Sequence, residues 1–380
     1  MIKSECVPFR NFSLCSIAFG IAILGVPFSG GSLSLMYYYP VILLVICLSV
    51  LHLLRWKSHM QIEHLCISVL LLISVWHMGT SIDNFETSKT LISILLFFIM
   101  FFLLVMYTPK LYEIKFIAKC FAVSGVIIAL LLFILKEEYG LGRYSYPIMG
   151  RLLEVNYLAC YLSITFLFNF HTMLISKNTK KVFYGIFSFM ILLAMFLTGS
   201  RGAFLAVSIS SIILLLYHPA KIIWKILLVF CLFALGFLFL PEDLTSRFLK
   251  DSYNDGSNQM RLYLFHNALN YILEKPVLGY GVSSGKAITG FGSAHNTFLS
   301  VLLNFGLIGL IMYFVIMFRN FKIFLQKDML LFLAVFVDLF ITSMIITNYN
   351  TIPFWFTMIF FIWVRDFKKK NPNISLWGEI

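Results

Sequence analysis

The chain has 380 residues, of which 60% are hydrophobic and only 12% are charged, and its mean hydropathy is +0.92. A soluble domain is roughly half apolar and about a quarter charged, so this composition excludes a soluble globular protein and indicates a polytopic membrane protein. The net charge of +12 does not indicate a nucleic-acid partner, because the basic residues are spread between apolar segments and no nucleic-acid-binding motif is visible.

Apolar stretches of about 20 residues, each long enough to cross a bilayer, recur along the sequence. The first resembles a signal peptide, but we expect an uncleaved span, because similar stretches follow and no clear cleavage site is present. We therefore predict an all-α, polytopic integral membrane protein of about twelve transmembrane helices, forming a single membrane domain over residues 1–380. The candidate spans are 12–28, 36–54, 62–80, 90–108, 116–135, 156–175, 182–198, 202–217, 222–240, 296–318, 329–346 and 352–364.

The basic residues predict the orientation of these spans. About two thirds of the 29 lysine and arginine residues fall in alternate connections, together with both ends of the chain. The positive-inside rule therefore predicts that both termini are cytoplasmic. On the opposite side, positive charge is concentrated in segments 136–155 and 241–295 and at Arg201. Positive charge kept on the disfavoured side often has a task, such as binding an anion.

Residues 241–295 form a long hydrophilic loop, about 55 residues in length, on the outer side. Apolar residues recur in it at helical spacing and predict an amphipathic helix over 258–274, which Pro276 helps to end. Glycines that include Gly279 and Gly281 then predict a flexible loop. Such a helix could lie on the outer leaflet and roof a cavity. The alternative is a solvated loop that carries one surface helix.

A first candidate for chemistry is Arg201, in a Gly199-Ser200-Arg201-Gly202 turn between two apolar runs. The two glycines would let the backbone approach a ligand closely, and the planar guanidinium would bind a phosphate. The alternative is a snorkelling arginine at a helix end.

Arg261 and His295 are the second and third candidates. Arg261 stands in the first turn of the amphipathic helix, where it is either a phosphate ligand or an ordinary exposed arginine. His295-Asn296 lies where the glycine-rich loop meets an apolar helix. Arginines near His295 should lower its pKa, so that the neutral imidazole acts as a general base; the alternative is a histidine bonded to a loop carbonyl.

Together these residues carry the parts of a reaction with a diphosphate leaving group. The arginines would hold the diphosphate and the histidine would take the proton of an acceptor hydroxyl. Paired acidic residues that would hold a divalent metal do not stand near them in the sequence. We therefore expect neither a metal nor a cofactor.

Three ordered motifs resemble those of the O-antigen ligase and O-antigen polymerase superfamily of bacterial envelope glycan enzymes. They are LTGSRGAFLAV at 197–207, MRLYLFHNAL with YILEKPVLGYG within 260–281, and AHNTFLSVLLNFGLIGLIMY at 294–313. They cover about a third of the chain, and segment 143–156 is a fainter match.

This resemblance implies a GT-C-like helical fold in the bacterial inner membrane, with an active site that faces the periplasm. It also implies an inverting, metal-independent transfer from an undecaprenyl-diphosphate-linked glycan. His295 would be the catalytic base, and Arg201 and Arg261 would bind the diphosphate. Supporting roles would fall to Gly199, Ser200, Gly202, Asn296, Gly279 and Gly281.

The acceptor is not fixed by the resemblance. We favour a polymerase, whose acceptor is a lipid-linked repeat unit and whose further partner would be a chain-length regulator protein. A ligase that uses lipid A–core as acceptor comes second, and transfer to a protein third. The sequence leaves open whether Arg143, Arg151 or Asn156 reach the site.

Two other classes stay open, a secondary transporter and a polysaccharide flippase. About twelve spans with both ends inside is a common transporter layout, but no inverted repeat or matching pair of broken helices is evident. Asp338 is the one clear acid within a span, and we interpret it as a polar contact between helices. A flippase would need a basic central cavity, whereas the arginines cluster toward the outer face.

Overall fold

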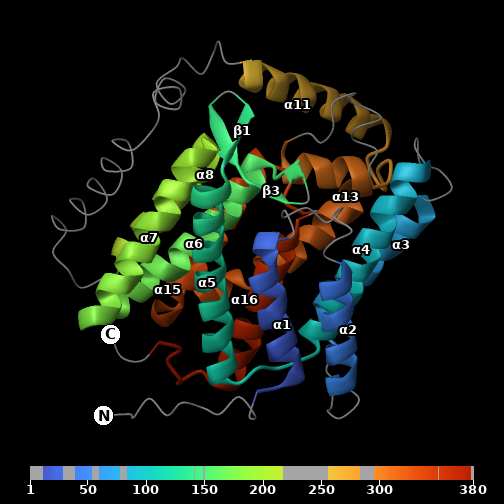
Figure 1. Ribbon diagram of the computed structural model, residues 1–380. Coiled ribbons are helices and arrows are strands. Elements are labelled where there is room, and N and C mark those ends of the chain that lie inside the picture. The colour runs from blue at the N-terminus through green and yellow to red at the C-terminus, as the bar shows by residue number, and fades with distance from the viewer. Residues whose placement is uncertain are drawn as a thin grey trace.

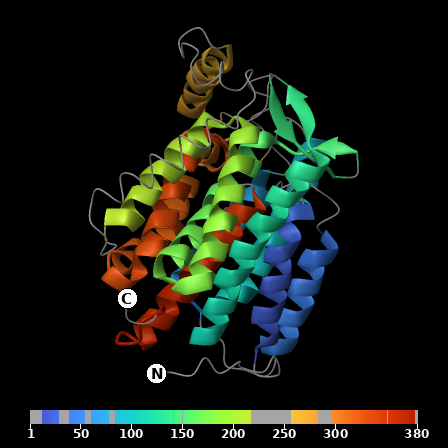
Figure 2. The same ribbon diagram turned by 60° about the vertical axis from the view of Figure 1, so that its left-hand side comes forward.

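Helices dominate the computed structural model, which describes residues 12–28, 39–53, 60–77, 84–140, 142–148, 150–216, 256–282, 295–349 and 351–377. They run alternately up and down in a bundle, and α11 lies across one end of it (Figures 1 and 2). The first helices are α1 (Leu14–Gly25), α2 (Tyr39–Leu53), α3 (Ile62–Trp76), α4 (Asn84–Val105), α5 (Leu111–Leu135), α6 (Val155–Ile175), α7 (Asn178–Thr198) and α8 (Arg201–Leu216). The later helices are α11 (Gly256–Glu274), α13 (Thr297–Phe318), α14 (Phe321–Phe324), α15 (Leu330–Ile345) and α16 (Ile352–Lys370).

Among the described residues, four helical stretches are long and apolar enough to cross a membrane: Leu111–Leu135, Val155–Ile175, Asn178–Thr198 and Thr297–Phe324. Shorter apolar helices accompany them, among them α3, α8 and α15. The fold therefore fits the predicted polytopic membrane protein, while the number of about twelve spans stays a prediction. The predicted span 222–240 lies outside the described residues.

Segment 137–152 departs from a purely helical fold. Strands β1 (Glu137–Gly140) and β2 (Arg143–Ser145) form one antiparallel hairpin, and β3 (Pro147–Ile148) and β4 (Arg151–Leu152) form a second. Gly140 and Gly150 adopt positive φ angles of 121° and 75°, which glycine reaches without steric cost. The all-α prediction was thus wrong for this short segment, which sits at the α11 end of the bundle (Figure 1).

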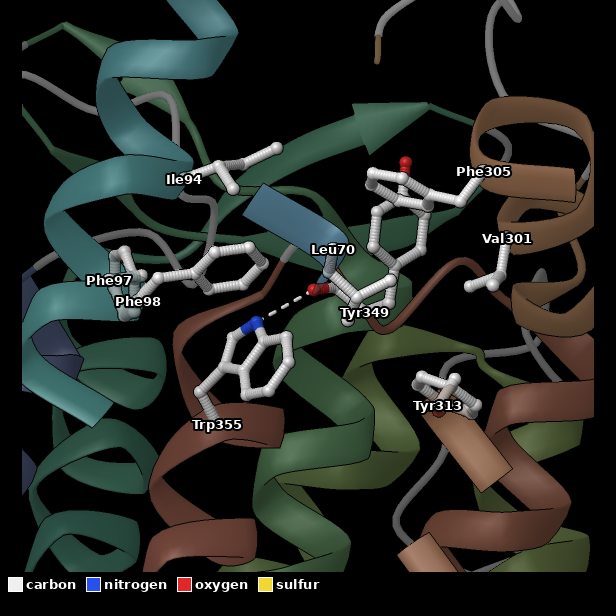
Figure 3. Close-up of a pocket in the computed structure, with 9 residues that line it drawn as sticks. All are labelled: Leu70, Ile94, Phe97, Phe98, Val301, Phe305, Tyr313, Tyr349 and Trp355. Atoms are coloured by element: carbon white, nitrogen blue, oxygen red, sulfur yellow. Dashed lines mark hydrogen bonds between the residues drawn. The ribbon is translucent and has the colours of Figure 1, made fainter. Parts of the chain in front are cut away.

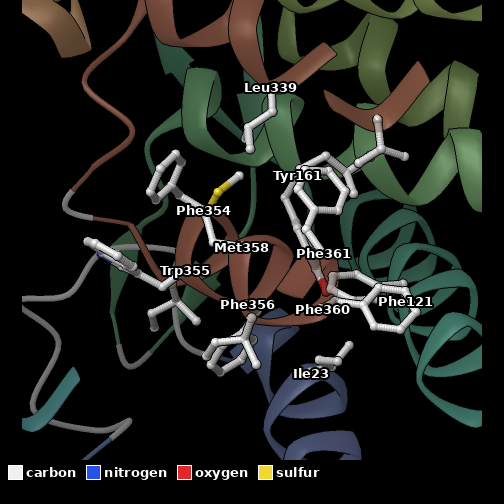
Figure 4. Packing of buried hydrophobic residues seen from close by; sticks show 14 of the residues in the cluster. Ile23, Phe121, Tyr161, Leu339, Phe354, Trp355, Phe356, Met358, Phe360 and Phe361 are labelled. Carbon is white, nitrogen blue, oxygen red and sulfur yellow. The ribbon is translucent and has the colours of Figure 1, made fainter. Parts of the chain in front are cut away.

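The core is built mainly from aromatic and branched side chains, and α16 runs through it. Residues 352–364 of α16 are all buried, and Figure 4 shows Phe360 and Phe361 among the rings of neighbouring helices. Phe121 stacks on Phe360 with ring centroids 5.6 Å apart. The helix continues past the predicted 352–364 to Lys370, and the basic residues of its last turn suit the C-terminal end of a helix.

A buried ion-pair cluster joins three helices at the end of the bundle opposite α11. The carboxylate of Glu63, at the start of α3, accepts from Arg365 of α16 and, at 2.6 Å, from Arg319 at the end of α13. Glu63 and Arg365 are almost completely buried, so each charge is tolerated only because the other compensates it. The cluster fixes the relative positions of α3, α13 and α16.

Helix α13 is interrupted at Gly306, whose φ of 64° and ψ of −164° are not helical. Just below this break lies a narrow apolar pocket, in which the indole nitrogen of Trp355 donates to the carbonyl oxygen of Tyr349 at 2.7 Å (Figure 3). The pocket is lined by Leu70, Ile94, Phe97, Phe98, Val301, Phe305, Tyr313, Tyr349 and Trp355. The apolar run of 296–318 predicted one continuous span, so the interruption is a difference from the prediction.

Candidate active site at the α11 end of the bundle

The turn between α7 and α8 presents Arg201 as the first residue of α8. Gly199 ends α7 in the left-handed conformation (φ 61°, ψ 23°), which favours glycine at this cap position. Gly202 lies against α15, since a Cβ atom there would come within 2.7 Å of Ile345 Cγ2. The close approach at Gly202 is therefore to a neighbouring helix, and this approach positions the start of α8 on the last turn of α15.

A hydrogen-bond network ties this turn to the hairpin segment and to α6. Arg143 donates from Nε to the carbonyl oxygen of Thr198 at 2.8 Å and from Nη2 to Asn156 Oδ1 at 2.7 Å. The Ser200 hydroxyl donates to the same Asn156 oxygen at 3.2 Å. Asn156 in turn donates to Glu154 Oε1 at 2.7 Å. Arg143 and Asn156, whose reach the sequence left open, thus contact the Ser200 turn.

Arg151 is the third residue that the sequence left open. It lies in β4 and is exposed. Its register partner in the hairpin is Ile148 of β3. The structure places it on the hairpin, and it is not among the groups of the hydrogen-bond network around Asn156.

His295 and Asn296 form the start of α13. Asn296 is the N-cap: its Oδ1 accepts from the Leu299 amide at 3.1 Å, and its Nδ2 donates to the Met344 carbonyl at 3.1 Å. His295 precedes it with a positive φ of 48°, a conformation uncommon for residues other than glycine. Because Met344 and Ile345 are neighbours on α15, the last turn of α15 contacts both Asn296 and Gly202.

The electrostatic environment of His295 favours its neutral form. Partial burial lowers the pKa of His295 below its usual value of 6.5, and the guanidinium of Arg261 lowers it further. The carboxylate of Glu154 acts in the opposite direction and raises that pKa. The imidazole therefore lies within electrostatic reach of a cation on α11 and of an anion at the start of α6.

Glu154 is a site residue that the sequence analysis missed. Its Oε2 accepts from the Tyr157 amide at 2.9 Å, so it caps α6, and its Oε1 accepts from Asn156. Both carboxylate oxygens are thereby held in place beside the Ser200 network. The available signal was an acidic residue two positions before Asn156, at the start of an apolar run.

The segment Pro276–Gly281 packs into the break of α13. Tyr280 and Gly281 donate from their amides to the carbonyls of Leu303 at 2.8 Å and Asn304 at 2.9 Å. In return, the Leu307 amide donates to the Pro276 carbonyl at 2.8 Å. The predicted flexible loop was therefore wrong for Gly279 and Gly281, because these bonds hold them against α13.

His77 secures the same segment from a third helix. Its Nε2 is hydrogen-bonded to the Gly279 carbonyl oxygen at 3.1 Å, and its Nδ1 to the Ile73 carbonyl oxygen at 2.8 Å. A Cβ atom at Gly281 would lie 2.6 Å from His77 Cβ. His77 thus joins α3 to the segment that follows α11.

The helix predicted over 258–274 is present as α11. Of its predicted apolar face, Ala268 and Ile272 are buried in a small apolar cluster with Leu299 and Leu303 of α13. Leu262 and Leu273 of the same face are exposed. The cluster and the Pro276–Gly281 segment together fix α11, which carries Arg261, against the helix that His295 precedes. Within the described ranges, no group of three or more His, Cys, Asp or Glu side chains is arranged so that it could hold a metal ion.

Comparison with known proteins finds a family model that matches these elements. Residues 186–314 match the family model described as O-Antigen ligase. The match includes α8, α11 and most of α13, and with them Arg201, Arg261 and His295. This match and the names of the relatives support the O-antigen ligase superfamily that the motifs predicted.

The individual relatives carry related names. The chain is 27% identical over 206 residues to the "Putative polysaccharide ligase RC0486" of Rickettsia conorii, which covers 47% of this chain and 49% of that protein. It is 25% identical over 225 residues to a "Putative polysaccharide ligase" of Rickettsia felis, which covers 53% and 54%. The chain thus spans about half the length of these curated relatives.

A solved structure is also similar in outline. It is described as "Structural coordination of polymerization and crosslinking by a peptidoglycan synthase complex", with 14% identity and a TM-score of 0.47. The similarity covers 84% of this chain and 99% of that chain.

Proposed function

We propose that the chain is a membrane glycosyltransferase that moves a glycan from a lipid diphosphate to an acceptor hydroxyl at the α11 end of the bundle. The observation that carries this proposal is the half-buried His295, whose neutral form is favoured beside the Arg261 guanidinium. A neutral imidazole at a boundary between water and a helix bundle is suited to general-base catalysis near neutral pH. The family match over residues 186–314 supports the same class of reaction.

In the proposed reaction, His295 accepts the proton of the acceptor hydroxyl. The hydroxyl oxygen then forms a bond to the anomeric carbon of the donor glycan while the bond from that carbon to the diphosphate oxygen breaks. The attack comes from the face opposite the leaving group, so the configuration at the anomeric carbon inverts. Arg201 and Arg261 bind the departing diphosphate and stabilise the charge that develops on it.

Glu154 has a supporting part in this reaction. When His295 takes up the proton, it becomes a cation within electrostatic reach of the Glu154 carboxylate. An opposite charge favours the protonated imidazole, so Glu154 offsets the unfavourable effects of burial and of Arg261. The caps and hydrogen bonds that fix Glu154 and Asn156 keep this carboxylate in place beforehand.

The network around Asn156 serves Arg201. Ser200 and the Thr198 carbonyl on one side of the turn are held by Asn156 and Arg143, and Gly202 is packed against Ile345. A guanidinium that follows a fixed turn loses less conformational freedom when it binds a diphosphate than one on a mobile loop.

We place the protein in the bacterial inner membrane with both termini in the cytoplasm and the α11 end facing the periplasm. The alternation of basic and poorly basic connections supports this orientation. The donor would be an undecaprenyl-diphosphate-linked glycan, as the superfamily implies.

For the acceptor, we propose lipid A–core, which makes the chain an O-antigen ligase. The sequence alone favoured a polymerase, but no residue decided that preference. The matched family model and the names of the relatives favour ligation. A polymerase that acts on lipid-linked repeat units is the alternative. Deletion of a ligase and deletion of a polymerase leave different lipid products, so the two can be told apart.

The test compares a deletion strain with the same strain complemented by wild-type chain, by His295→Ala or by His266→Ala. His266 is the matched control, because it is an exposed histidine on α11 that has no part in the mechanism. The readouts are the lipopolysaccharide ladder, the undecaprenyl-linked glycan pool and the amount of protein in the membrane.

A ligase predicts lipid A–core without repeats, and long chains retained on undecaprenyl diphosphate, in the deletion and His295→Ala strains. A polymerase predicts lipid A–core that carries a single repeat unit. A normal ladder with His295→Ala would contradict the proposed base. A normal ladder in the deletion strain would contradict glycan transfer and favour a transporter or flippase.

A further inference from the structure

A groove of about 330 Å³ opens where the end of α3 meets the segment that follows α11. Its side chains include those of Trp76, Lys275, Val277 and Leu278. Neither Trp76 nor Lys275 takes part in the reaction proposed above. The groove therefore needs an explanation that is independent of glycan transfer.

The groove lies at the end of an exposed apolar stripe on α3. Ile62, Leu65, Leu72 and Trp76 are spaced at 3, 10 and 14 residues from the first, which places them on one face of the helix. All four are exposed, Leu72 and Trp76 to 68% each. On a helix of a membrane protein, an apolar face that the rest of the protein does not cover faces the lipid.

The stripe is long enough for one leaflet. Ile62 and Trp76 are 14 positions apart, which corresponds to about 21 Å along a helix. Half of a hydrocarbon core of about 30 Å is about 15 Å. An acyl chain whose glycerol and headgroup lie near Trp76 would thus stay on the stripe over the depth of a leaflet. Tryptophan prefers this level of the bilayer because its ring is apolar and its N–H is polar.

Lys275 supplies a cation at that level. Its ammonium lies 4.5 Å from the centroid of the Tyr280 ring and its side chain is exposed. An ammonium has three donors, so it can keep the ring contact and still donate to a phosphate. The neighbouring carboxylate of Glu274 accepts from the Tyr280 hydroxyl at 2.6 Å, which directs one of its oxygens to that partner.

The apolar lining indicates what kind of anion would bind. Val277 is 56% exposed and Leu278 is 37% exposed, and both flank Lys275 in the groove. A free phosphate ion is fully hydrated and would gain nothing from these hydrocarbon surfaces. A phosphate attached to an acyl chain would bury them and would also satisfy the cation.

We propose that this groove binds the headgroup of an anionic bilayer phospholipid, whose acyl chain lies along the apolar stripe of α3. Such a lipid would contact the Pro276–Gly281 segment directly, next to the point where His77 holds it. The bound lipid would thus stabilise the junction of α3, α11 and α13 from the membrane side.

The experiment reconstitutes the full chain in nanodiscs that contain increasing fractions of brominated phosphatidylglycerol or brominated phosphatidylcholine. Bromine quenches tryptophan on contact, and the difference between wild type and Trp76→Phe isolates the signal of Trp76. We expect half-maximal quenching of Trp76 at about fivefold less phosphatidylglycerol than phosphatidylcholine, the factor that corresponds to about 1 kcal/mol for one lysine at an anionic surface.

Lys275→Gln and Lys275→Glu should remove this preference. Lys136→Glu should keep it, and it is a matched control because Lys136 is also exposed and lies over a tyrosine ring, 5.4 Å from the centroid of Tyr144. Equal quenching of wild type by both lipids, or a preference that survives both Lys275 variants, would overturn the proposal. Recovery of Trp76 fluorescence on addition of millimolar inorganic phosphate would also overturn it, in favour of a free-anion site.

Discussion

Replacement of Gly306 by alanine should disrupt the junction that holds α11 against α13. Gly306 has a φ of 64° and a ψ of −164°, a region that side-chain-bearing residues scarcely populate. A Cβ atom there would lie 2.2 Å from both the carbonyl carbon and the oxygen of Val277. These are backbone atoms, so they cannot move aside as the end of a flexible side chain would.

The loss of folding free energy caused by Gly306→Ala has two parts. Backbone strain of this kind amounts to about 1–3 kcal/mol. Insertion of a methyl group into a well-packed place costs about 1–3 kcal/mol more. The Gly306→Ala change should therefore destabilise the folded chain by about 2–6 kcal/mol. Alternatively, the Pro276–Gly281 segment could move away from α13, which would break hydrogen bonds such as that from the Leu307 amide to the Pro276 carbonyl.

The matched control is Gly185→Ala in the interior of α7. The nearest atom to a Cβ there is Met173 Sδ at 3.4 Å, an ordinary contact with a flexible side chain. Alanine is the better helix former by about 1 kcal/mol, so this variant should be as stable as wild type or more stable.

The assay heats detergent-solubilised protein and measures the fraction that remains monodisperse by size-exclusion chromatography. We expect the midpoint of Gly306→Ala to fall by several degrees while that of Gly185→Ala does not fall. Glycan transfer by Gly306→Ala should also fall, because the disrupted junction positions α11, which carries Arg261, against α13, which follows His295. A Gly306→Ala variant with the midpoint and the transfer activity of wild type would refute the reasoning.

The remaining predictions concern the chemistry of the proposed site. Arg201→Lys and Arg261→Lys should each lower transfer by about 10–100-fold at normal protein levels, since a two-pronged guanidinium becomes a point charge; wild-type transfer in both variants would remove the diphosphate clamp. Glu154→Gln removes a group that raises the pKa of His295, so the acid limb of the pH–rate profile should move to lower pH. Arg261→Gln removes a group that lowers this pKa, so the acid limb should move to higher pH. A shift of the acid limb in the same direction for both variants would contradict this environment for the base. Chelation by EDTA should leave transfer unchanged in membranes, and a loss that added magnesium restores would disprove the metal-independent reaction.

Local sequence patterns predicted some features of the candidate site but not others. The three motifs were recognisable because each is continuous along the chain, and the amphipathic pattern of 258–274 was long enough to predict α11. Glu154 escaped notice because its part depends on distance to His295, and these residues are 141 positions apart in the sequence. Only the packing of α6 against α15, whose last turn contacts the start of α13, brings the two charges within reach of each other.

The break in α13 escaped notice for a different reason. Leu303 to Ile308 lies in a run that is apolar apart from Asn304, and a single glycine in such a run is often tolerated within a helix. The partner that stabilises the break is the Pro276–Gly281 segment, which replaces the lost helical hydrogen bonds with bonds of its own. A helix can be interrupted inside a membrane protein only where another part of the protein satisfies its backbone.

The sequence by itself therefore determined the helical membrane class of the protein, most of the described helices and the residues that carry the family motifs. These depend on composition and on periodicity within about 20 neighbouring residues, which hydrophobic burial and backbone hydrogen bonding translate directly into helices. The tertiary structure alone decided which charges surround His295, how the Ser200 turn is fixed and where Gly306 interrupts α13. Those features depend on contacts between residues far apart in the chain, and such contacts exist only once the helices have packed.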